Sequence, residues 1–341
     1  MKRLLFLIIV SATLWSGYWL YGSSTTRSAF ADWFAERRAE GWVADHAALE
    51  VRGFPNRFDV TLTDIALADP GTGWAWTAPF FQILALSYKP NHVIAVWPDL
   101  QHVATPLGKF DITQAAMQAS IVLWPSAAIA PDRIRLVADT LQISASDGTG
   151  TAMSALRIAA ERLGPDGEPA TAAPAEGATR YRIALSAEGF APDLALRHRI
   201  DPTDRLPRTL DALRADVTLG FDRPWDRRAV EEARPQPRQI ALRLAEARWG
   251  ELELKAAGEL EIDAAGDATG RITVKAQNWR EILAMARASG ELPGGVAGTL
   301  ERALSLLAGR NDGIDIPLDF RRGLIWIGPV PVMDSPVFVL R

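Results

Sequence analysis

The chain has 341 residues, enough for two average domains or one large all-β domain. Its net charge of -4 gives no electrostatic reason to bind nucleic acid, and the absence of cysteine excludes disulfides, thiolate metal sites and a cysteine nucleophile. Twelve tryptophans are spread along the sequence, so large amphipathic rings are placed throughout whatever core or surface the chain builds.

The N-terminus predicts a membrane anchor. Lys2 and Arg3 precede an uncharged run, residues 4–21, long enough to cross a hydrocarbon core of about 30 Å at about 1.5 Å per residue. The basic pair marks the cytoplasmic end, and a cluster of Trp and Tyr at the far end is typical of an interfacial aromatic belt. The residues that we expect to form the anchor include Leu4, Phe6, Ile9, Trp15 and Trp19. The bulk of the protein then lies outside the cytoplasm.

A cleaved signal peptide is the alternative, because Ala29-Phe30-Ala31 has the small-x-small form of a processing site after Ala31. This tripeptide begins well past the apolar run, and the run is longer than the roughly 7 to 15 residues of a usual signal-peptide core. An uncleaved anchor is therefore the favoured interpretation.

A short amphipathic helix is predicted after the anchor, over residues 27–42. Phe30, Trp33 and Phe34 recur at helical spacing, with charged residues mainly around the rest of the helix. These aromatics either rest on the membrane surface or cap the end of a sheet, and capping is the commoner arrangement.

From residue 47 the apolar pattern changes to a period of two, which predicts strands. Gly53-Phe54-Pro55 indicates a turn, after which Phe58, Val60 and Leu62 share one face. A parity switch after Asp64 predicts a bulge. Further strands are expected within the following segments: 79–98, as two strands around Lys89-Pro90-Asn91, then 108–113, 117–123, 133–143 and 153–162, the last of which fits a helix equally well.

The second half carries the clearest meander pattern. A loop rich in Ala, Pro and Gly at 164–180 precedes it, and turn signals at Gly250, Gly258 and Gly266 separate successive apolar faces. Asn278 and Glu281 fit the capping box of a following helix. A second helix is expected over 300–310, before closing strands.

These elements predict a mainly β (α+β) fold, with curled antiparallel β-sheets and a few short helices on a single N-terminal transmembrane helix. The expected division is residues 1–24 for the cytoplasmic tip and anchor, 25–163 for an N-terminal β-rich half, 164–180 for a flexible loop and 181–341 for a C-terminal half. The apolar faces either close on each other as a sandwich or barrel, or curl into an open apolar trough.

A set of aromatic residues in the apolar strands is the candidate ligand groove. Its members are Trp74, Trp76, Phe80, Phe81, Trp97 and Trp124. Core packing is the commoner use of such rings, whereas an exposed apolar trough in a soluble domain indicates a hydrophobic ligand.

The sequence contains no phosphate-binding loop, dinucleotide-binding fingerprint, nucleophile elbow or metalloprotease helix motif. His92 and His102 in neighbouring strands, with Asp99 or Asp111, give a conceivable metal pair, but strand ends commonly carry histidine for other reasons. Asp64, Asp69 and Asp99 are the carboxylates that a hydrolase could pair, although carboxylates near Gly and Pro are usually turn formers. We expect no enzyme activity, no metal and no cofactor.

The order of elements resembles a bacterial family described as domain of unknown function 2125 (DUF2125), over almost the whole chain. The resemblance rests on the anchor and aromatic helix, the Gly53-Phe54-Pro55 turn before Phe58-Asp59-Val60, the segment 79–98, the meander-to-helix unit 258–279 and the closing Gly323-Leu324-Ile325-Trp326-Ile327-Gly328-Pro329. The C-terminal units are also distantly similar to the ends of AsmA-like envelope proteins.

These resemblances imply a single-pass protein of the bacterial inner membrane with its C-terminal bulk in the periplasm. Its expected partners are membrane lipids and possible envelope proteins, with no nucleic acid. The favoured function is non-enzymatic binding or shielding of lipid acyl chains in outer-membrane and envelope homeostasis. An anchored scaffold with a closed β core is the alternative, and a hydrolase ranks third.

Overall fold

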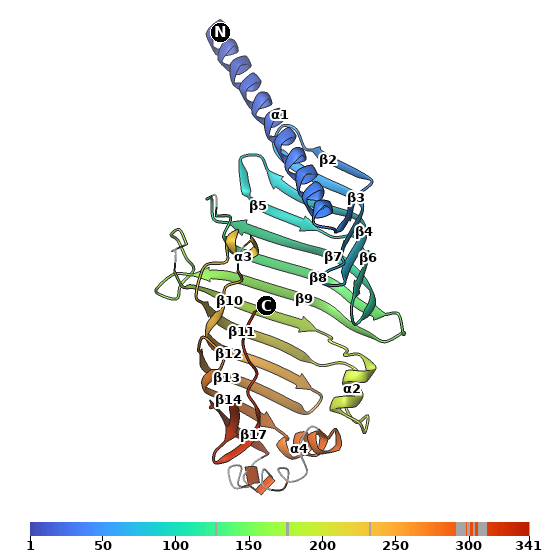
Figure 1. Cartoon of the computed structure of the whole chain (residues 1–341), viewed down its shortest axis with the longest axis vertical. Helices are drawn as coiled ribbons and strands as arrows, with labels where there is room; N and C mark the ends of the chain where they lie inside the picture. Colours follow the sequence, from blue (N-terminus) through green and yellow to red (C-terminus); the bar gives the residue numbers. More distant parts are fainter. Residues whose placement is uncertain are drawn as a thin grey trace. The chain divides into compact units, whose positions relative to one another are not determined.

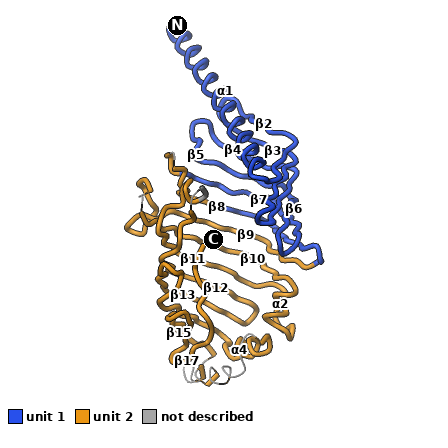
Figure 2. Tube along the Cα trace, in the orientation of Figure 1, with its two compact units in different colours: residues 1–123, 136–148 blue, residues 124–135, 149–341 orange. Residues whose placement is uncertain are grey.

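The structure is a computed structural model (Figure 1) that describes residues 1–126, 128–174, 177–231, 233–290, 298, 301–302, 304–305 and 312–340. The chain forms two compact units (Figure 2): unit 1 contains residues 1–123 and 136–148, and unit 2 contains residues 124–135 and 149–341. The predicted loop at 164–180 lies within unit 2.

The helices are α1 (Lys2–Ala39), α2 (Leu194–Ile200), α3 (Arg228–Glu231) and α4 (Trp279–Ala288). The strands of unit 1 are β1 (Val43–Asp45), β2 (Ala48–Arg52), β3 (Arg57–Asp69), β4 (Trp74–Leu86), β5 (Lys89–Val96), β6 (Leu100–Thr105) and β7 (Gly108–Leu123), and β8 (Pro131–Ala145) has residues in both units. The strands of unit 2 are β9 (Gly150–Leu163), β10 (Thr179–Glu188), β11 (Ala212–Phe221), β12 (Pro237–Trp249), β13 (Leu252–Ile262), β14 (Ala268–Gln277), β15 (Gly313–Arg321), β16 (Leu324–Ile327) and β17 (Val330–Asp334).

The mainly β, antiparallel fold predicted from the sequence is confirmed. In unit 1, β3 pairs with β1, β2 and β4, while β4 pairs with β5 and β6, and both of these pair with β7. In unit 2, β9 to β17 pair in chain order, each antiparallel to the next. The segment 153–162, which also fitted a helix, is part of strand β9.

Several predicted boundaries are wrong. The segments 108–113 and 117–123 form one strand, β7, in which Ala116 has a positive φ of 59°. Gly258 is not a turn but lies inside β13 opposite Ile272. Its φ of 155° and the close approach of the Arg271 carbonyl leave no room for a Cβ atom, so the glycine permits tight strand packing. The helix expected over 300–310 falls largely outside the described residues.

The bulge predicted at Asp64 does not form. Thr63 pairs with Phe80 and Ile65 pairs with Ala78, so no residue is inserted on either side of the ladder. Instead, Asp64 has a left-handed φ of 48°, and the buried side of β3 changes from Leu62 to Ile65 across it.

The predicted capping box of α4 does not form. Asn278 occupies the N-cap in a left-handed conformation with φ 57°, and its side chain makes no cap hydrogen bond. Its amide Nδ2 instead donates to the carbonyl oxygen of Glu251 at 2.8 Å, which ties the helix start to the β12–β13 turn.

The predicted anchor and the predicted amphipathic helix are one continuous helix, α1. Within the described part of the chain, α1 alone has the length and apolar composition to cross a membrane, which is compatible with a single-pass anchor or a signal sequence. Its N-terminal end projects beyond the strands of unit 1 (Figure 1), and the helix from Trp15 onward contacts them.

From Trp19 onward, α1 covers the apolar face of β3. Trp19 packs with Phe58 and Val60, and Phe34, which is 1% exposed, packs with Leu62 and the rest of the adjoining core cluster. Phe34 also stacks on the ring of His46, with centroids 4.5 Å apart. The alternating pattern of β3 is therefore completed by a helix, and the helical aromatics pack on the sheet as the capping arrangement predicted.

Three aromatic side chains near the end of the predicted membrane span bond to unit 1. Trp15 Nε1 donates to Pro55 O at 3.0 Å, the Tyr18 hydroxyl donates to Ser87 O at 2.6 Å, and Trp19 Nε1 donates to Arg57 O at 2.7 Å. The aromatic cluster at the far end of the predicted span is therefore tied to the rest of unit 1, because the backbone carbonyls of Pro55, Arg57 and Ser87 satisfy its polar atoms.

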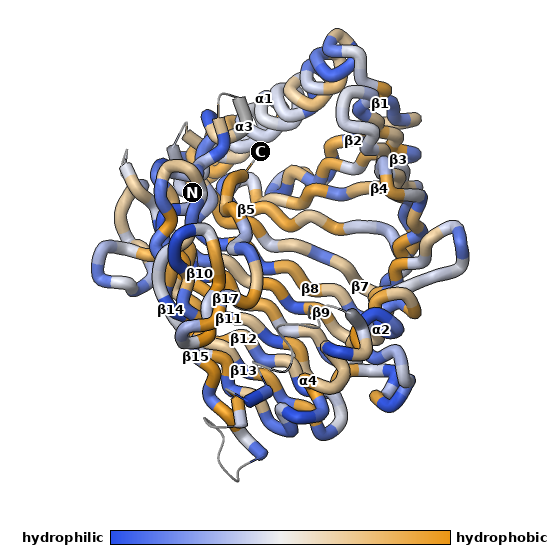
Figure 3. The backbone as a smooth tube through the Cα atoms, turned by 60° about the horizontal axis from the view of Figure 1, so that its bottom comes forward, coloured by the Kyte–Doolittle hydropathy of each residue, from blue (hydrophilic) through white to orange (hydrophobic). Residues whose placement is uncertain are grey.

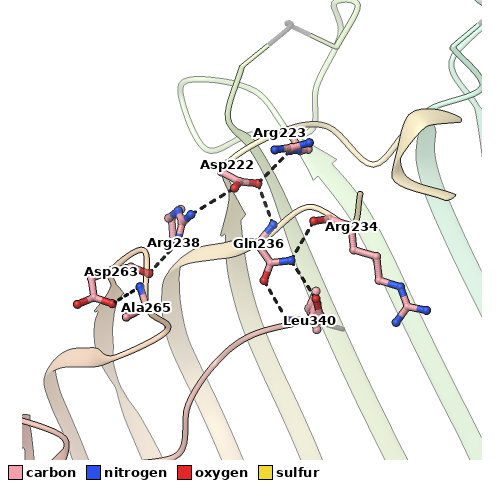
Figure 4. Close-up of polar contacts among 8 residues, drawn as sticks. All are labelled: Asp222, Arg223, Arg234, Gln236, Arg238, Asp263, Ala265 and Leu340. Atoms are coloured by element: carbon pink, nitrogen blue, oxygen red, sulfur yellow. Dashed lines mark hydrogen bonds and ion pairs between the residues drawn. The ribbon is translucent and has the colours of Figure 1, made fainter. Parts of the chain in front are cut away.

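The C-terminal segment is held along unit 2 by polar contacts (Figure 4). The Gln236 side chain forms a paired hydrogen bond with the backbone of Leu340, accepting from its N–H at 3.0 Å and donating to its carbonyl at 3.0 Å. Arg238 bridges Asp222 and the Asp263 carbonyl nearby. Phe338 packs on the cluster around Leu260, so the tail is a structural part of this unit.

Replacing Trp19 with alanine is expected to destabilise unit 1 by about 3–5 kcal/mol, the usual loss for a buried aromatic. The variant removes contacts with Phe58 and Phe54 and the bond to Arg57 O. Denaturant unfolding in mild detergent measures the effect. Tyr21→Ala is the matched control, because Tyr21 is 75% exposed and its loss is expected to change stability by less than about 0.5 kcal/mol. Equal stability of the two variants would contradict the packing role of Trp19.

Candidate apolar binding pockets

An apolar pocket of about 350 Å³ lies between α1 and the sheet of unit 1, and we call it the α1 pocket. Because α1 crosses the face of β3 and β4, side chains from both layers line it. The lining residues are Ala29, Phe30, Trp33, Phe34, Leu62, Ile65, Leu67, Trp76 and Phe81. No charged side chain is among them, so the pocket suits a hydrocarbon ligand.

Aromatic rings in β4 form one wall of the α1 pocket. The rings of Trp76 and Phe81 meet edge to face at 5.5 Å, and Trp97 packs behind Phe81 at 5.2 Å. Trp76 Nε1 donates to Gln101 Oε1 at 2.7 Å, which satisfies its only polar atom. The wall therefore presents ring carbon to the pocket.

The sequence-predicted groove residues are only partly brought together. Trp76 and Phe81 line the α1 pocket, Trp97 backs it, and Trp74 lines a neighbouring pocket of about 320 Å³ that shares Trp76. Phe80, the residue before Phe81 in β4, lines neither of these two pockets. Trp124 belongs to unit 2.

Unit 2 holds a larger apolar pocket of about 500 Å³, which we call the α2–α4 pocket. Side chains of α2, α4, the segment 206–210 and strands β12 and β13 line it: Leu196, Arg199, Ile200, Leu206, Leu210, Ala247, Trp249, Leu252, Leu254, Ile282, Met285, Ala286 and Ser289. Figure 3 shows that hydrophobic residues recur along the strands of this unit.

Sequence reasoning missed the α2–α4 pocket. No helix was predicted over Leu194–Ile200, where the structure has α2, with Leu196 N donating to the capping Asp193 side chain at 2.7 Å. The apolar positions of α4 and of β13 were visible as separate patterns. Their convergence on one space depends on long-range pairing, which a local pattern does not report.

A family described as "Uncharacterized protein conserved in bacteria (DUF2125)" matches residues 19–336. The chain belongs to the DUF2125 family. No curated protein and no solved structure matches the chain.

The histidines of this DUF2125 protein do not converge. His92 in β5 bonds to Ser120 at 2.8 Å, whereas His102 in β6 bonds to Asp111 at 2.7 Å, and these partners lie in different halves of β7. A His92–His102 metal pair is therefore wrong. Among the residues that the structure describes, no three His, Cys, Asp or Glu side chains gather as a metal site requires.

The carboxylates proposed for a hydrolase serve local structure. Asp69 accepts hydrogen bonds from Gly71 N at 2.9 Å and from the Thr72 hydroxyl at 2.7 Å, and the Thr72 bond is the main cause that lowers the pKa of Asp69. This geometry is that of a turn former, as the commoner interpretation predicted. Asp64 is the left-handed residue of β3 described above.

Trp124 lies in a polar part of unit 2, not in an apolar groove. The Arg162 guanidinium sits 5.3 Å from its ring centroid, and Arg162 also bonds to Asp132 at 2.9 Å and to the Ala172 carbonyl at 2.7 Å. Next to this cluster, the buried Tyr181 hydroxyl donates to the Pro131 carbonyl at 2.8 Å. A buried cation with three partners fixes structure, so Trp124 is removed from the candidate groove.

Burial raises the pKa of Tyr181 from its ordinary value of 10.0 to about 12. The folded state therefore favours the neutral phenol, and this contribution to stability is complete below pH 10 and is lost as the pH rises through about 12. The free energy of unfolding should fall more steeply with pH in this window for the natural chain than for Tyr181→Phe, measured by urea unfolding at several pH values. Parallel slopes for the two proteins would contradict the burial of this phenol.

Proposed function

We propose that this DUF2125 protein is a membrane-anchored, non-enzymatic protein of the bacterial envelope that binds or shields lipid acyl chains. The apolar lining of the α1 pocket and of the α2–α4 pocket is the observation that carries the proposal. Both volumes, about 350 and 500 Å³, fall in the range of roughly 300–1,000 Å³ typical of small-molecule sites.

The packing of α1 supports its retention as an anchor. The helix continues without a break through Ala29-Phe30-Ala31, the site at which a signal peptidase would cut. Removal of residues 1–31 would strip Trp19 and Phe30 from the core and expose Phe58 and Val60. Lys2 and Arg3 at the free end of the helix favour a cytoplasmic N-terminus, with the two units on the opposite, periplasmic side.

The chemistry of the pockets favours long hydrocarbon chains over compact polar ligands. Each buried methylene contributes about 0.8 kcal/mol, while association costs roughly 4–15 kcal/mol in lost freedom. A ligand without charge contacts must therefore bury many methylenes before it binds. A lipid acyl chain meets this condition, and the distant resemblance of the C-terminal units to AsmA-like envelope proteins agrees with a lipid ligand.

Affinity for fatty acids is expected to rise by about fourfold for each added methylene, the value that corresponds to about 0.8 kcal/mol. Titration of the detergent-free protein in nanodiscs with a fatty-acid series of increasing chain length measures this dependence. An affinity independent of chain length would contradict apolar burial as the driving force and would favour a scaffold without a lipid ligand.

Charged substitutions in the pocket walls are expected to lower acyl-chain affinity by at least tenfold, because an aspartate must be desolvated by the ligand. Leu254→Asp tests the α2–α4 pocket and Trp33→Asp tests the α1 pocket; the two side chains are 36% and 40% exposed, so the fold tolerates the change.

The matched controls for these variants are Leu194→Asp in α2 and Val43→Asp in β1. Both side chains are more exposed than Leu254 and Trp33, at 54% and 49%, and neither lines the α1 pocket, the α2–α4 pocket or the pocket beside Trp74. Uptake of a fluorescent fatty acid measures each variant. Equal uptake by the pocket variants and their controls would overturn the proposed function.

A further inference from the structure

The position at which α1 docks on unit 1 limits how much free helix is left to cross a membrane. Trp15 is the first side chain of the predicted span that forms a hydrogen bond outside the helix, to the Pro55 carbonyl. The apolar helix ahead of it, Leu4–Leu14, has a length of about 16 Å at about 1.5 Å per residue. A bilayer hydrocarbon core is about 30 Å thick. The free part of α1 therefore covers only about half of the core.

The remaining half must be covered by helix that is already docked. A span of about 20 residues from Leu4 ends near Ser23. Between Trp15 and Ser23, however, one side of α1 faces two turns of unit 1 and not lipid. These turns are residues 53–56, which join β2 to β3, and residues 87–88, which join β4 to β5.

Hydrogen bonds fix both turns at the same level of the helix. Trp15 bonds to Pro55 in the first turn, and Tyr18 bonds to Ser87 in the second. Trp19 packs edge to face on Phe54, with ring centroids 5.4 Å apart. The turns therefore cannot stay in water while α1 spans the membrane, because the contacts that hold them lie within the span.

The exposed side chains at the tips of the turns fit a lipid interface. Phe54 is 57% exposed and Tyr88 is 64% exposed, although both are large aromatics. Arg52 and Lys89 flank the two turns, and Arg52 is already paired with Glu50. Exposed aromatics beside basic residues are the composition that favours the boundary between acyl chains and phosphate headgroups. The long basic side chains reach the phosphates while the rings lie deeper.

We propose that the two turns carrying Phe54 and Tyr88 insert into the interfacial region of the lipid leaflet on the side of unit 1. The inference rests on the anchoring part of the proposed function and adds a second membrane contact to it. Unit 1 is then seated in the membrane surface, and α1 with the two turns forms one membrane-binding surface. This surface binds bilayer lipid.

Single-cysteine labelling tests the insertion, because the natural chain has no cysteine. The full chain carrying Phe54→Cys or Tyr88→Cys is labelled with an environment-sensitive fluorophore and reconstituted into phosphatidylcholine and phosphatidylglycerol vesicles. A nitroxide on the acyl chain close to the headgroup serves as the quencher. Labels at both positions are expected to show blue-shifted emission and to lose most of it to the quencher.

Leu107→Cys is the matched water-exposed control. Leu107 is 94% exposed in the β6–β7 turn. Because Ala75 pairs with Ala104, this turn lies beside the β3–β4 turn, at the opposite end of β3 from residues 53–56. Its label should stay unquenched. Quenching at 54 and 88 no greater than at 107 would overturn the inference. Tyr88 provides the second position because, among the described residues, no aromatic ring packs on it as Trp19 packs on Phe54.

A label at Val10→Cys separates this inference from the anchor. Val10 lies in the free part of α1 and should be quenched if the helix crosses the bilayer. Quenching at 10 without quenching at 54 and 88 would refute turn insertion and leave the anchor intact. Absence of quenching at 10 would overturn the anchor, and the turn insertion with it.

Discussion

The packing of α1 on β3 is the contact on which the account depends. A strand with Phe58, Val60 and Leu62 on one face must bury that face, and α1 does so through Trp19, Phe30 and Phe34. The same helix carries the only segment, within the described residues, suited to cross a membrane. Under the proposed function, this one element links the β core of unit 1 to the bilayer. This linkage explains why the aromatics near the end of the apolar run bond to backbone carbonyls and not to water.

The two apolar pockets follow from the same physical limit on covering a sheet. A helix about 10–12 Å across covers only about two strands spaced about 4.8 Å apart, so it leaves part of the apolar face of a wider sheet open beside it. In unit 1 this open part is the α1 pocket, and in unit 2 the short helices α2 and α4 leave the α2–α4 pocket over β12 and β13. Under the proposed function, a lipid chain would complete such a surface, with a gain of about 25 cal/mol per Å² of apolar surface buried.

Much of the fold was predictable because its signals are local. The period of two in β3 and in the β12–β14 meander, and the apolar run of α1, identify their elements directly. The errors arose where the same residue type is compatible with two different local structures. Gly258 carries the same signal whether it forms a turn or permits close strand approach, and Asn278 fits an N-cap whether or not its side chain caps the helix. The anchor and the amphipathic helix were predicted as two elements but form one helix, because Gly22 and Ser23 are tolerated in a helix that packs against Phe58.

The site was less predictable because it depends on contacts between distant segments. Trp76 and Phe81 were identified from their strand, but the α1 side chains that complete their pocket were assigned only to packing. Trp124 has the same residue type and a similar strand context, yet Arg162 covers its ring. Residue type and spacing thus identified the β4 side of the pocket. The side formed by α1 could not be assigned without knowing which helix lies over which strand.

The most direct measurement of the central claim is native mass spectrometry of the full chain, gently extracted from a bacterial envelope. Residues 1–26 must be retained because Trp19 belongs to the core of unit 1. The account predicts added mass that dissociates as phospholipid or another long-chain lipid on activation. A bare protein mass in every extraction, with no uptake after exposure to lipid, would contradict acyl-chain binding.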